Sequence, residues 1–456
     1  MKDSIENLVN AQRNFFWSDA TKPIDFRLQQ LKKLKSVIKA HEDEMIAGIA
    51  LDFKKSEFDT YTNELALLYH DLDEAIRKLK SWSRIRRVGT NMVNFPARSY
   101  IIPEPLGVVL VIGAWNYPYQ LSLAPIIPAI AAGCTVILKP SELPSNTSRI
   151  MANMIANNFN PNYLAVVEGD VETTTTLLEQ RFDKIFFTGS TTVGRIVYQA
   201  AAKHLTPVTL ELGGKSPAFI TESCDMKMSV KRLVWAKFLN SGQTCIAPDY
   251  ILVNHKVKQA FLDALTAEMK KNEFSFEAGT LVQIINDKNV DRLAKLIDPA
   301  KVYAGGHVDR ESRYVEPTIL NDVSFDDPVM QEEIFGPILP VIVYQDLSEA
   351  IQQVKRLPKP LSCYVFTNDS KIKKRILREL SFGGGAVNDA VMHITNPKLP
   401  FGGVGNSGMG AYHGEAGFKS FTHYKSVLDK PTWIEFGLKY YPRTASKLNI
   451  IKRFFG

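Results

Sequence analysis

Short apolar segments, each ending in a turn that contains glycine or polar residues, recur between residues 107 and 190 of this 456-residue chain. Segments of helix length separate them. Buried apolar strands that alternate with helices are typical of parallel βαβ units in which helices cover both faces of the sheet. The rhythm therefore predicts an α/β fold, and the four strands are expected at GVVLVIGAW, TVILKP, AVVEGD and KIFFTGS.

The same rhythm resumes after residue 211. Strands are expected at PAFI, DYILV, PVIVY and SCYVF, and VKQAFLDALTAEMKK is expected to be one of the helices between them. This indicates a second α/β unit over residues 211–405, with a boundary near residue 210 that follows from the rhythm alone. Two doubly wound parallel-sheet domains are thus predicted.

The segments before and between these units have other patterns. Residues 25–90 carry apolar residues at helical spacing, with charged residues on the other face. Around residues 94–103 the pattern changes to a short β-like alternation, which predicts a protruding strand or hairpin.

Charge limits the partners of the chain. The net charge is only +7, from 55 basic and 48 acidic side chains that are interleaved along most of the sequence. A nucleic-acid-binding protein would show a concentrated basic stripe, so no nucleic-acid partner is expected. The basic tail Trp433–Gly456 is the exception. It is interpreted as a solvated end that covers a partner subunit or domain, with a weak membrane-surface contact as the alternative.

Cysteine usage and the chain start bear on location. The four cysteines have no paired spacing, and they form no metal-ligand cluster with histidine. The N-terminal residues lack the architecture of a signal peptide, and no apolar run reaches the roughly 18 residues of a membrane span. A cytoplasmic protein without a bound metal is therefore predicted.

Three segments carry residues suited to covalent chemistry. In NSGQTC, Cys245 lies in a turn that can expose a nucleophilic sulfur and a backbone N–H together. In LELGGKSP, Glu211 ends an apolar strand before two glycines, which is a suitable place for a general base. In GAWNYP, Asn116 offers an amide donor for a developing oxyanion. When each segment is taken alone, a plainer interpretation is the more common one. Cys245 would be a small buried hydrophobic residue, Glu211 a solvated acid at a strand end, and Asn116 an asparagine in a turn before proline.

Further segments suit a nucleotide. In FTGSTTVG, Gly189 and Gly194 lie between a strand and a helix whose N-terminus could face a pyrophosphate, although the spacing is not the common GxGxxG. Lys139 and Glu142 in KPSE, together with EEIFGP, could hold ribose hydroxyls at the carboxyl edge of a sheet. By spacing alone these are weak signals.

The order of the motifs is far more specific than any one of them. GAWNYP, ILKPSE, FTGSTTVG, LELGGKSP, NSGQTC, EEIFGP and LPFGGVGNSGMG follow one another over some 300 residues. This order resembles the aldehyde dehydrogenase superfamily, from Phe15 to the C-terminus. The short N-terminus, NSGQTCIAPDY, NSGMGAYHG and the tail YYPRTASKLNIIKRF resemble its class 3 branch of fatty and aromatic aldehyde dehydrogenases.

The resemblance implies the catalytic roles. Cys245 would attack the aldehyde carbonyl, and Asn116 and the backbone N–H of Cys245 would hold the resulting oxyanion. Hydride transfer to NAD(P) would leave a thioester on Cys245. Glu211 would activate the water that hydrolyses this thioester to the carboxylate, and it would also help to deprotonate Cys245.

Cofactor and substrate residues are also implied by the resemblance. The positions that match cofactor-binding residues of the family are Trp115, Lys139, Glu142, Gly189, Ser190, Gly194, Leu212, Glu333 and Phe335. Tyr117 and Phe401 are candidates for the apolar aldehyde funnel. A medium- or long-chain aliphatic aldehyde, or an aromatic one, is the expected substrate. NAD is expected to be preferred, with measurable NADP activity, since Glu142 would repel a 2′-phosphate.

Family resemblance further implies the domain arrangement. A Rossmann-like cofactor domain would comprise residues 1–83 and 104–210, and a catalytic domain residues 211–405. Residues 84–103 and 406–456 would form a small β oligomerisation element, and a homodimer is expected.

Three other functions fit the sequence less well. A cysteine hydrolase or acyltransferase would need a histidine partner for Cys245, and no histidine stands in a recognisable partner motif. A CoA-acylating relative would not need Glu211. An inactive binding paralogue would not need Cys245, Glu211 and Asn116 together.

Overall fold

The computed structural model describes residues 2–455, with side chains for residues 2–453, and separates into two compact units. The large unit comprises Met1–Trp82 and Pro105–Thr422, and the small unit comprises Ser83–Glu104 and His423–Gly456. Met1 and Gly456 lie outside the described residues.

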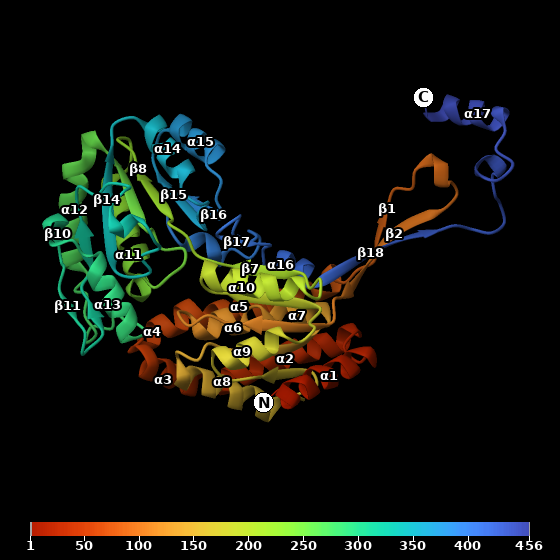
Figure 1. The fold of residues 1–456 in the computed structure, drawn as a ribbon, viewed down its shortest axis with the longest axis horizontal. Coiled ribbons are helices and arrows are strands. Elements are labelled where there is room, and N and C mark those ends of the chain that lie inside the picture. Colours follow the sequence, from red (N-terminus) through yellow and green to blue (C-terminus); the bar gives the residue numbers. More distant parts are fainter. Residues whose placement is uncertain (1, 456) are drawn as a thin grey trace. The chain divides into compact units, whose positions relative to one another are not determined.

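A six-stranded sheet forms the first half of the large unit, in the order β17-β7-β6-β3-β4-β5. Figure 1 labels β17 and β7, the two strands at one end of this order. Neighbouring strands are parallel except at the edge, where β17 runs antiparallel to β7. Its strands are β3 (Val108–Ile112), β4 (Thr135–Lys139), β5 (Leu164–Val166), β6 (Lys184–Thr188), β7 (Val208–Glu211) and β17 (Gly408–Met409). The helices between them are α6 (Pro118–Leu123), α7 (Ile126–Ala132), α8 (Ser145–Asn158), α9 (Val171–Leu178) and α10 (Thr191–Ala202).

Helices cover both faces of this sheet, and alternate residues of β3 therefore enter different cores. Val109 and Val111 pack in a cluster with α2 (Ile24–Ala40), α5 (Ala66–Trp82) and α7. Val108, Leu110 and Ile112 pack with α1 (Lys2–Trp17), α9 and α10. Successive side chains of a strand point to opposite faces. A strand covered on both sides must therefore be apolar throughout, as the sequence of β3 is.

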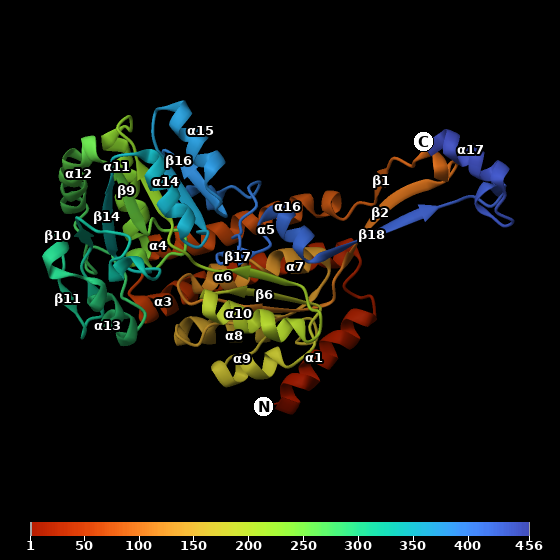
Figure 2. The ribbon, with the colours of Figure 1, turned by 45° about the horizontal axis from the view of Figure 1, so that its top comes forward.

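The second sheet has seven strands in the order β10-β13-β14-β9-β8-β15-β16, in the green to light-blue part of the ribbon (Figure 2). Only β10 is antiparallel to its neighbour. The strands are β8 (Pro217–Ile220), β9 (Tyr250–Asn254), β10 (Val302–Ala304), β13 (Thr318–Leu320), β14 (Ile338–Tyr344), β15 (Ser362–Phe366) and β16 (Gly384–Val387). The hairpin of β11 (Val308–Asp309) and β12 (Tyr314–Val315) belongs to this part of the large unit, as do the helices α11 (Met226–Phe238), α12 (Lys258–Lys271), α13 (Asp287–Leu296), α14 (Leu347–Arg356) and α15 (Ser370–Glu379). Helix α16 (Gly414–Ser420) instead packs on α7.

The N-terminal region is a helical layer. It consists of α1 (Lys2–Trp17), α2 (Ile24–Ala40), α3 (Glu42–Phe53), α4 (Glu57–Thr60), a π-helical turn (Tyr61–Leu65) and α5 (Ala66–Trp82). The apolar stripes of α2 and α5 are buried against α7. A π-helical turn is rare and changes the direction of the side chains it carries, and here it carries the buried Glu64.

The small unit contains a three-stranded sheet in the order β1-β2-β18, followed by the C-terminal helix α17 (Ala445–Phe455). β1 (Arg86–Val88) pairs antiparallel with β2 (Arg98–Pro105), and β18 spans Thr422–Asp429. The tail predicted to touch a partner or a membrane ends in this unit. The side chains of Phe454 and Phe455 in that tail lie outside the described residues.

The predicted α/β class is confirmed, and each expected strand has its counterpart in β3, β4, β5, β6, β8, β9, β14 or β15. Two segments differ from the expectation. The helical pattern ends at Trp82, because Arg86–Val88 pairs with β2 instead. Residues 406–422, assigned from the sequence to the oligomerisation element, belong to the large unit, because β17 pairs with β7 and α16 packs on α5 and α7.

Candidate active site

A cavity of about 1040 Å³ lies in the large unit. Its wall is formed by the carboxyl ends of β3, β4, β6 and β7, by the turn that carries Cys245, and by residues 330–335. Ligands of open parallel sheets bind at this edge. The cavity has the size of a site for a ligand larger than most drug molecules.

The turn before Cys245 has an unusual backbone. Asn240, Ser241 and Gly242 have φ values of 56°, 52° and 71°, so three consecutive residues are left-handed. A non-glycine residue in this region costs roughly 1–3 kcal/mol. Ser241 is held by its hydroxyl, which donates to the carbonyl of Val282 at 2.6 Å and accepts from the N–H of Val282 at 3.0 Å.

Gly242 permits close contact between this turn and the EEIFGP segment. A Cβ atom on Gly242 would lie 2.2 Å from the carbonyl oxygen of Gly336. Only glycine fits there. The turn and the segment that carries Glu333 are therefore packed backbone against backbone.

Cys245 is partly exposed in the cavity wall and is not disulfide-bonded. Burial raises the pKa of its thiol well above the ordinary value, and the carboxylates of Glu333 and Glu211 raise it further. The backbone N–H groups of Cys245 and Ile246 oppose this by lowering the pKa. A thiol in this setting stays protonated until a base takes its proton.

Glu211 ends β7 and also lines the cavity. It is 3% exposed, and neither carboxylate oxygen has a hydrogen-bond partner within residues 2–455. Desolvation raises the pKa of this carboxyl well above its ordinary value. A buried carboxyl whose pKa is raised and whose two oxygens are both free is suited to general base catalysis.

Asn116 lies after β3 and is 3% exposed. Its side-chain amide donates to the carbonyl of Gln243 at 3.0 Å, and its own carbonyl accepts from the Asn240 amide at 3.0 Å. These bonds join the β3 turn to the turn that carries Cys245. An amide nitrogen has two N–H donors, so Asn116 retains one donor beyond the bond to Gln243.

The strand-to-helix turn after β6 lines another part of the cavity. Gly189 lies against the Phe187 ring, where a Cβ atom would come within 2.6 Å of ring carbon Cζ. Ser190 caps α10 by accepting from the N–H of Val193 at 3.3 Å. The first turn of α10, including Thr191 and Thr192, lines the cavity, and N–H groups at a helix start favour anionic groups.

Lys139 and Glu142 lie at the end of β4. Lys139 is 2% exposed, and its ammonium donates to the carbonyl of Pro140 at 2.8 Å and to the carboxylate of Glu142 at 3.2 Å. The Glu142 side chain is 43% exposed. The pair therefore presents one buried cation and one accessible carboxylate to the cavity.

Two basic side chains hold the segment that carries Glu333. Lys215 donates to the carboxylate of Asp249 at 2.5 Å and to the carbonyls of Val329 and Glu332 at 3.0 and 2.9 Å. Arg292 donates to the carbonyl of Ile334 at 2.6 Å.

Glu333 itself rests on a glycine. A Cβ atom on Gly213 would come within 1.8 Å of the Glu333 carboxylate, so this glycine makes room for Glu333. Burial raises the pKa of Glu333 to about 8. Next to it, the Phe335 ring contacts Trp115 edge-on, with centroids 5.3 Å apart, and both rings line the cavity.

Most of the residues named from the sequence line this one cavity. They are Trp115, Asn116, Lys139, Glu142, Gly189, Ser190, Glu211, Leu212, Cys245, Glu333, Phe335 and Phe401. Gly194 does not line it and instead packs on Leu212, where a Cβ atom would come within 2.6 Å of Cδ2. Tyr117 is buried outside the lining, and its hydroxyl hydrogen-bonds the Thr244 hydroxyl at 2.7 Å.

Several neighbours of the site were not assigned a role from the sequence. Gln243 connects Asn116 to Ile285. Its backbone carbonyl accepts from the Asn116 side-chain amide, and its side-chain oxygen accepts from the N–H of Ile285 at 3.0 Å. Lys215 stands inside the LELGGKSP motif, but the sequence indicates no role for it, and Arg292 stands in none of the motifs. Their partners are distant in sequence, so no local pattern indicates them.

Comparison with known proteins decides the family. The sequence model described as "Aldehyde dehydrogenase family" matches residues 2–427. The chain belongs to the aldehyde dehydrogenase family.

Relatives within this family cover almost the whole chain. It is 46% identical over 455 residues to "4,4'-diaponeurosporen-aldehyde dehydrogenase" of Staphylococcus aureus, with 99% of each chain covered. It is 46% identical to "Aldehyde dehydrogenase, dimeric NADP-preferring" of Rattus norvegicus, covering 94% of this chain and 95% of the relative. It is 44% identical to "Aldehyde dehydrogenase family 3 member A2" of Pongo abelii, covering 98% and 94%.

Solved structures agree. "Substrate bound state of Staphylococcus Aureus AldH" matches with a TM-score of 0.97 and 45% identity, and 99% of each chain is covered. The aldehyde dehydrogenase KauB of Pseudomonas aeruginosa matches with a TM-score of 0.87 at 26% identity, covering 94% of this chain and 89% of that one.

As an aldehyde dehydrogenase of the class 3 type, the protein oxidises an aldehyde to the acid with NAD(P). The cavity suits that cofactor, because it has the volume, a helix start for phosphates and the buried Lys139. The accessible carboxylate of Glu142 and the carboxylate of Glu333 also line it and suit ribose hydroxyls. Within residues 2–455, no helix has the length and apolar character to cross a membrane.

Proposed function

We propose that aldehyde oxidation in this protein proceeds through a thioester on Cys245, with Glu211 as the general base and Asn116 as the oxyanion donor. The observation that supports this most directly is that all three side chains, from three separate segments, line one cavity. Among the described residues no histidine lines that cavity, which disfavours a cysteine hydrolase of the Cys–His type.

The first step is attack by sulfur on the aldehyde carbon. Since burial keeps the Cys245 thiol protonated, Glu211 accepts its proton directly or through water. The carbonyl oxygen gains negative charge, and the second N–H of Asn116 and the backbone N–H of Cys245 donate to it. A preorganised donor of this kind contributes roughly 3–4 kcal/mol to transition-state stabilisation.

Bound NAD(P)+ supplies the acceptor for the hydride that leaves the substrate carbon. Trp115, Lys139, Glu142, Gly189, Ser190, Leu212, Glu333 and Phe335 would hold it. Gly194 contributes by letting α10 pack closely on Leu212.

Hydrolysis completes the cycle. Glu211 takes a proton from water, the hydroxide attacks the thioester carbon, and the C–S bond breaks to give the carboxylate and free Cys245. A CoA-acylating enzyme transfers the acyl group to CoA and does not need this base. The free carboxylate of Glu211 in the cavity favours hydrolysis.

NAD is proposed as the preferred cofactor, with NADP also used. The carboxylate of Glu142 would accept from a ribose 2′-hydroxyl and would repel a 2′-phosphate. The Lys139 ammonium, 3.2 Å from Glu142, partly offsets that repulsion. The rat and mouse relatives are named "NADP-preferring", so the two cofactors must be compared directly.

The proposed substrate is a medium- or long-chain aliphatic aldehyde, or an aromatic one. Phe401 and Trp115 place aromatic surface in the cavity that contains Cys245. Each additional buried CH₂ contributes roughly 0.8 kcal/mol, so kcat/KM is expected to rise with chain length. Tyr117 would act on the substrate only indirectly, through Thr244.

A homodimer is proposed, with Ser83–Glu104 and His423–Gly456 as the oligomerisation unit. A cytoplasmic location and a weak membrane contact through the tail remain predictions from the sequence.

The test of the catalytic proposal follows NAD(P)H formation by absorbance, with and without CoA. Without CoA the wild type is expected to turn over, and Cys245→Ala to form no product. Glu211→Gln is expected to lose roughly 10²–10⁴-fold in kcat and to form the thioester in a slowed first turnover, with water in place of Glu211 as the acceptor of the thiol proton. Activity that requires CoA, or that survives in Cys245→Ala, would contradict the proposal.

A further inference from the structure

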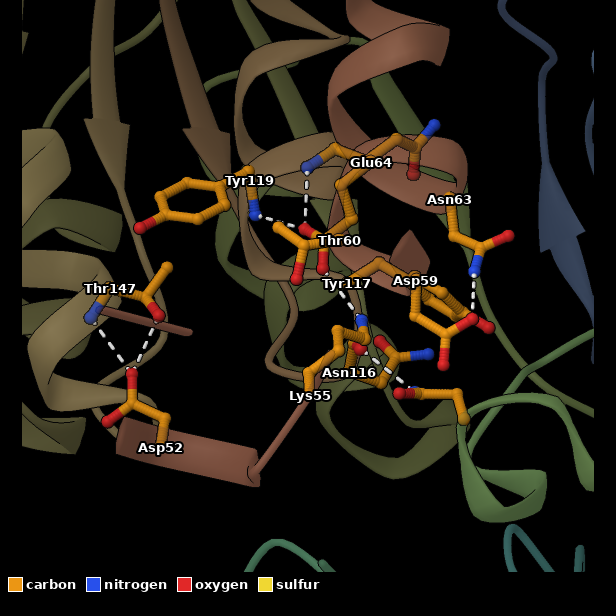
Figure 3. Close-up of polar contacts among 12 residues, drawn as sticks. Asp52, Lys55, Asp59, Thr60, Asn63, Glu64, Asn116, Tyr117, Tyr119 and Thr147 are labelled. Atoms are coloured by element: carbon orange, nitrogen blue, oxygen red, sulfur yellow. Dashed lines mark hydrogen bonds and ion pairs between the residues drawn. The ribbon is translucent and has the colours of Figure 1, made fainter. Parts of the chain in front are cut away.

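Lys55 and Glu64 form a buried ion pair, and neither residue lines the cavity. Figure 3 shows both side chains together with Asn116 and Tyr117. The ammonium of Lys55 is 2.7 Å from the carboxylate of Glu64, and their side chains are 1% and 0% exposed. Lys55 follows α3, and Glu64 belongs to the π-helical turn.

Stability alone gives no reason for this pair. Two charges lose their hydration when buried, and an apolar pair of the same volume often stabilises a fold equally well. The contacts of both side chains instead lead towards the active site.

Glu64 holds the start of α6. Its second carboxylate oxygen accepts from the N–H of Tyr119 at 2.8 Å and from the N–H of Gln120 at 3.3 Å (Figure 3). Only Pro118 separates these residues from Asn116 and Tyr117. Glu64 therefore fixes the point where the chain leaves the oxyanion turn.

Lys55 supports Tyr117. Its ammonium lies 4.4 Å from the centroid of the Tyr117 ring, a distance at which a desolvated cation and an aromatic ring attract each other. The hydroxyl of that ring hydrogen-bonds the Thr244 hydroxyl at 2.7 Å, and Thr244 precedes Cys245.

A second connection runs through the backbone. The carbonyl of Phe53, two residues before Lys55, accepts from the N–H of Gln283 at 2.7 Å. The carbonyl of Gln283 accepts from the side chain of Gln243 at 3.1 Å, and Gln243 also receives the Asn116 amide. The segment with Lys55 thus reaches the nucleophile turn by two routes.

We propose that Lys55 and Glu64 are positioning residues that hold the Asn116–Tyr117 turn against Thr244, and so fix the oxyanion donor relative to the Cys245 sulfur. This inference rests on the proposed roles of Cys245 and Asn116. A misplacement of about 1 Å can lower a rate by roughly a hundredfold.

The experiment measures the single-turnover rate of NADH formation and the Kd for NAD by titration. Removing one charge strands the other, so the main variant is Lys55→Met/Glu64→Gln, in which glutamine keeps an acceptor for α6. Its single-turnover rate is expected to fall roughly ten- to a hundredfold. Its Kd for NAD should stay within about twofold of wild type, because neither side chain lines the cavity.

Lys35→Met is the matched control. Lys35 forms an ion pair of 2.6 Å with Asp73 on the exposed face of the same helical layer. It should leave both the rate and the Kd for NAD unchanged.

A double-mutant cycle separates positioning from general loosening. If the Lys55–Glu64 pair acts through the Tyr117 hydroxyl, Lys55→Met/Glu64→Gln should cost much less rate in a Tyr117→Phe background than in wild type. Additive losses, an unchanged rate in the main variant, or a parallel loss of NAD affinity would each overturn the inference. Cys245→Ala is measured in the same experiment. If it retains activity, the proposed function fails. If it is inactive, as expected, the result for Lys55 and Glu64 tests the positioning inference separately from the proposed function.

Discussion

At the scale of single residues, the site depends on carboxyl groups with very different surroundings. Glu211 is buried and has no hydrogen-bond partner among the described residues. The carboxylate of Glu333 lies against Gly213, and Glu142 is partly exposed beside Lys139. Burial raises the pKa of the first two. The three groups are therefore expected to respond differently to substitution by a neutral side chain.

Glu211 should make the fold less stable as pH rises. Its pKa is raised in the folded protein, so the folded state keeps a proton that the unfolded state releases above about pH 4.3. The folded state loses stability relative to the unfolded state from that pH upward, until the folded-state pKa is passed. Glu211→Gln should therefore have a higher Tm than wild type at pH 8 and nearly the same Tm at pH 4, measured by calorimetry. A constant difference across this range would contradict the assignment.

Glu142 should set the choice between the cofactors. Glu142→Gln removes the negative charge near a 2′-phosphate but keeps a hydrogen-bonding side chain. The ratio of kcat/KM for NADP to that for NAD is expected to rise roughly tenfold, which corresponds to about 1.4 kcal/mol. Glu57→Gln, at the start of α4, is the control for an acid that does not line the cavity. No change in the ratio for Glu142→Gln would show that this carboxylate does not distinguish the 2′-hydroxyl of NAD from the 2′-phosphate of NADP.

At the scale of elements, close backbone contacts position the EEIFGP segment. Gly242 lies on Gly336, Gly213 lies on the Glu333 carboxylate, and Lys215 and Arg292 bind its carbonyls. A small change at one of these contacts should displace the segment as a whole.

Gly213→Ala tests this contact. The added Cβ would meet the Glu333 carboxylate at 1.8 Å, so Glu333 must move. The KM for the cofactor is expected to rise roughly tenfold or more, whereas the enzyme should remain folded. Gly89→Ala is the matched control, because a Cβ there has no neighbour within 4 Å. Equal KM values in the two variants would contradict a role for the position of Glu333.

The sequence predicts some elements well and others poorly, for physical reasons. β3 and β4 are buried on both faces, so their composition alone marks them. β17 has two residues and is a strand only through its pairing with β7, so no local sequence pattern predicts it. Cys245, Glu211 and Asn116 stand in specific motifs, so the sequence indicates them. The roles inferred for Lys55 and Glu64 depend on contacts that form only in the folded protein.

At the scale of the whole molecule, the small unit exposes apolar side chains. Met92 is 84% exposed, and Val93 and Phe95 are more than half exposed. Large exposed apolar groups that lie together mark an association surface. This is the surface we expect to be covered in the proposed dimer.

Met92→Lys tests that assembly. Sedimentation velocity of the wild type should give twice the mass of the chain, and the variant should shift towards the monomer at micromolar concentration, because a lysine charge is costly to bury. Leu51→Lys, at a 71% exposed position in the large unit, should leave the mass unchanged. A wild type that sediments as a monomer would contradict the proposal.

The proposed thioester on Cys245, which Glu211 helps to hydrolyse, can be detected by mass spectrometry. The intact and peptide masses of Glu211→Gln are measured after brief mixing with NAD and a medium-chain aldehyde, followed by acid quenching. We expect an adduct with the mass of the aldehyde less two hydrogens, on the peptide that contains Cys245, and none in Cys245→Ala. An active Glu211→Gln enzyme without any adduct, or an adduct on another residue, would contradict it.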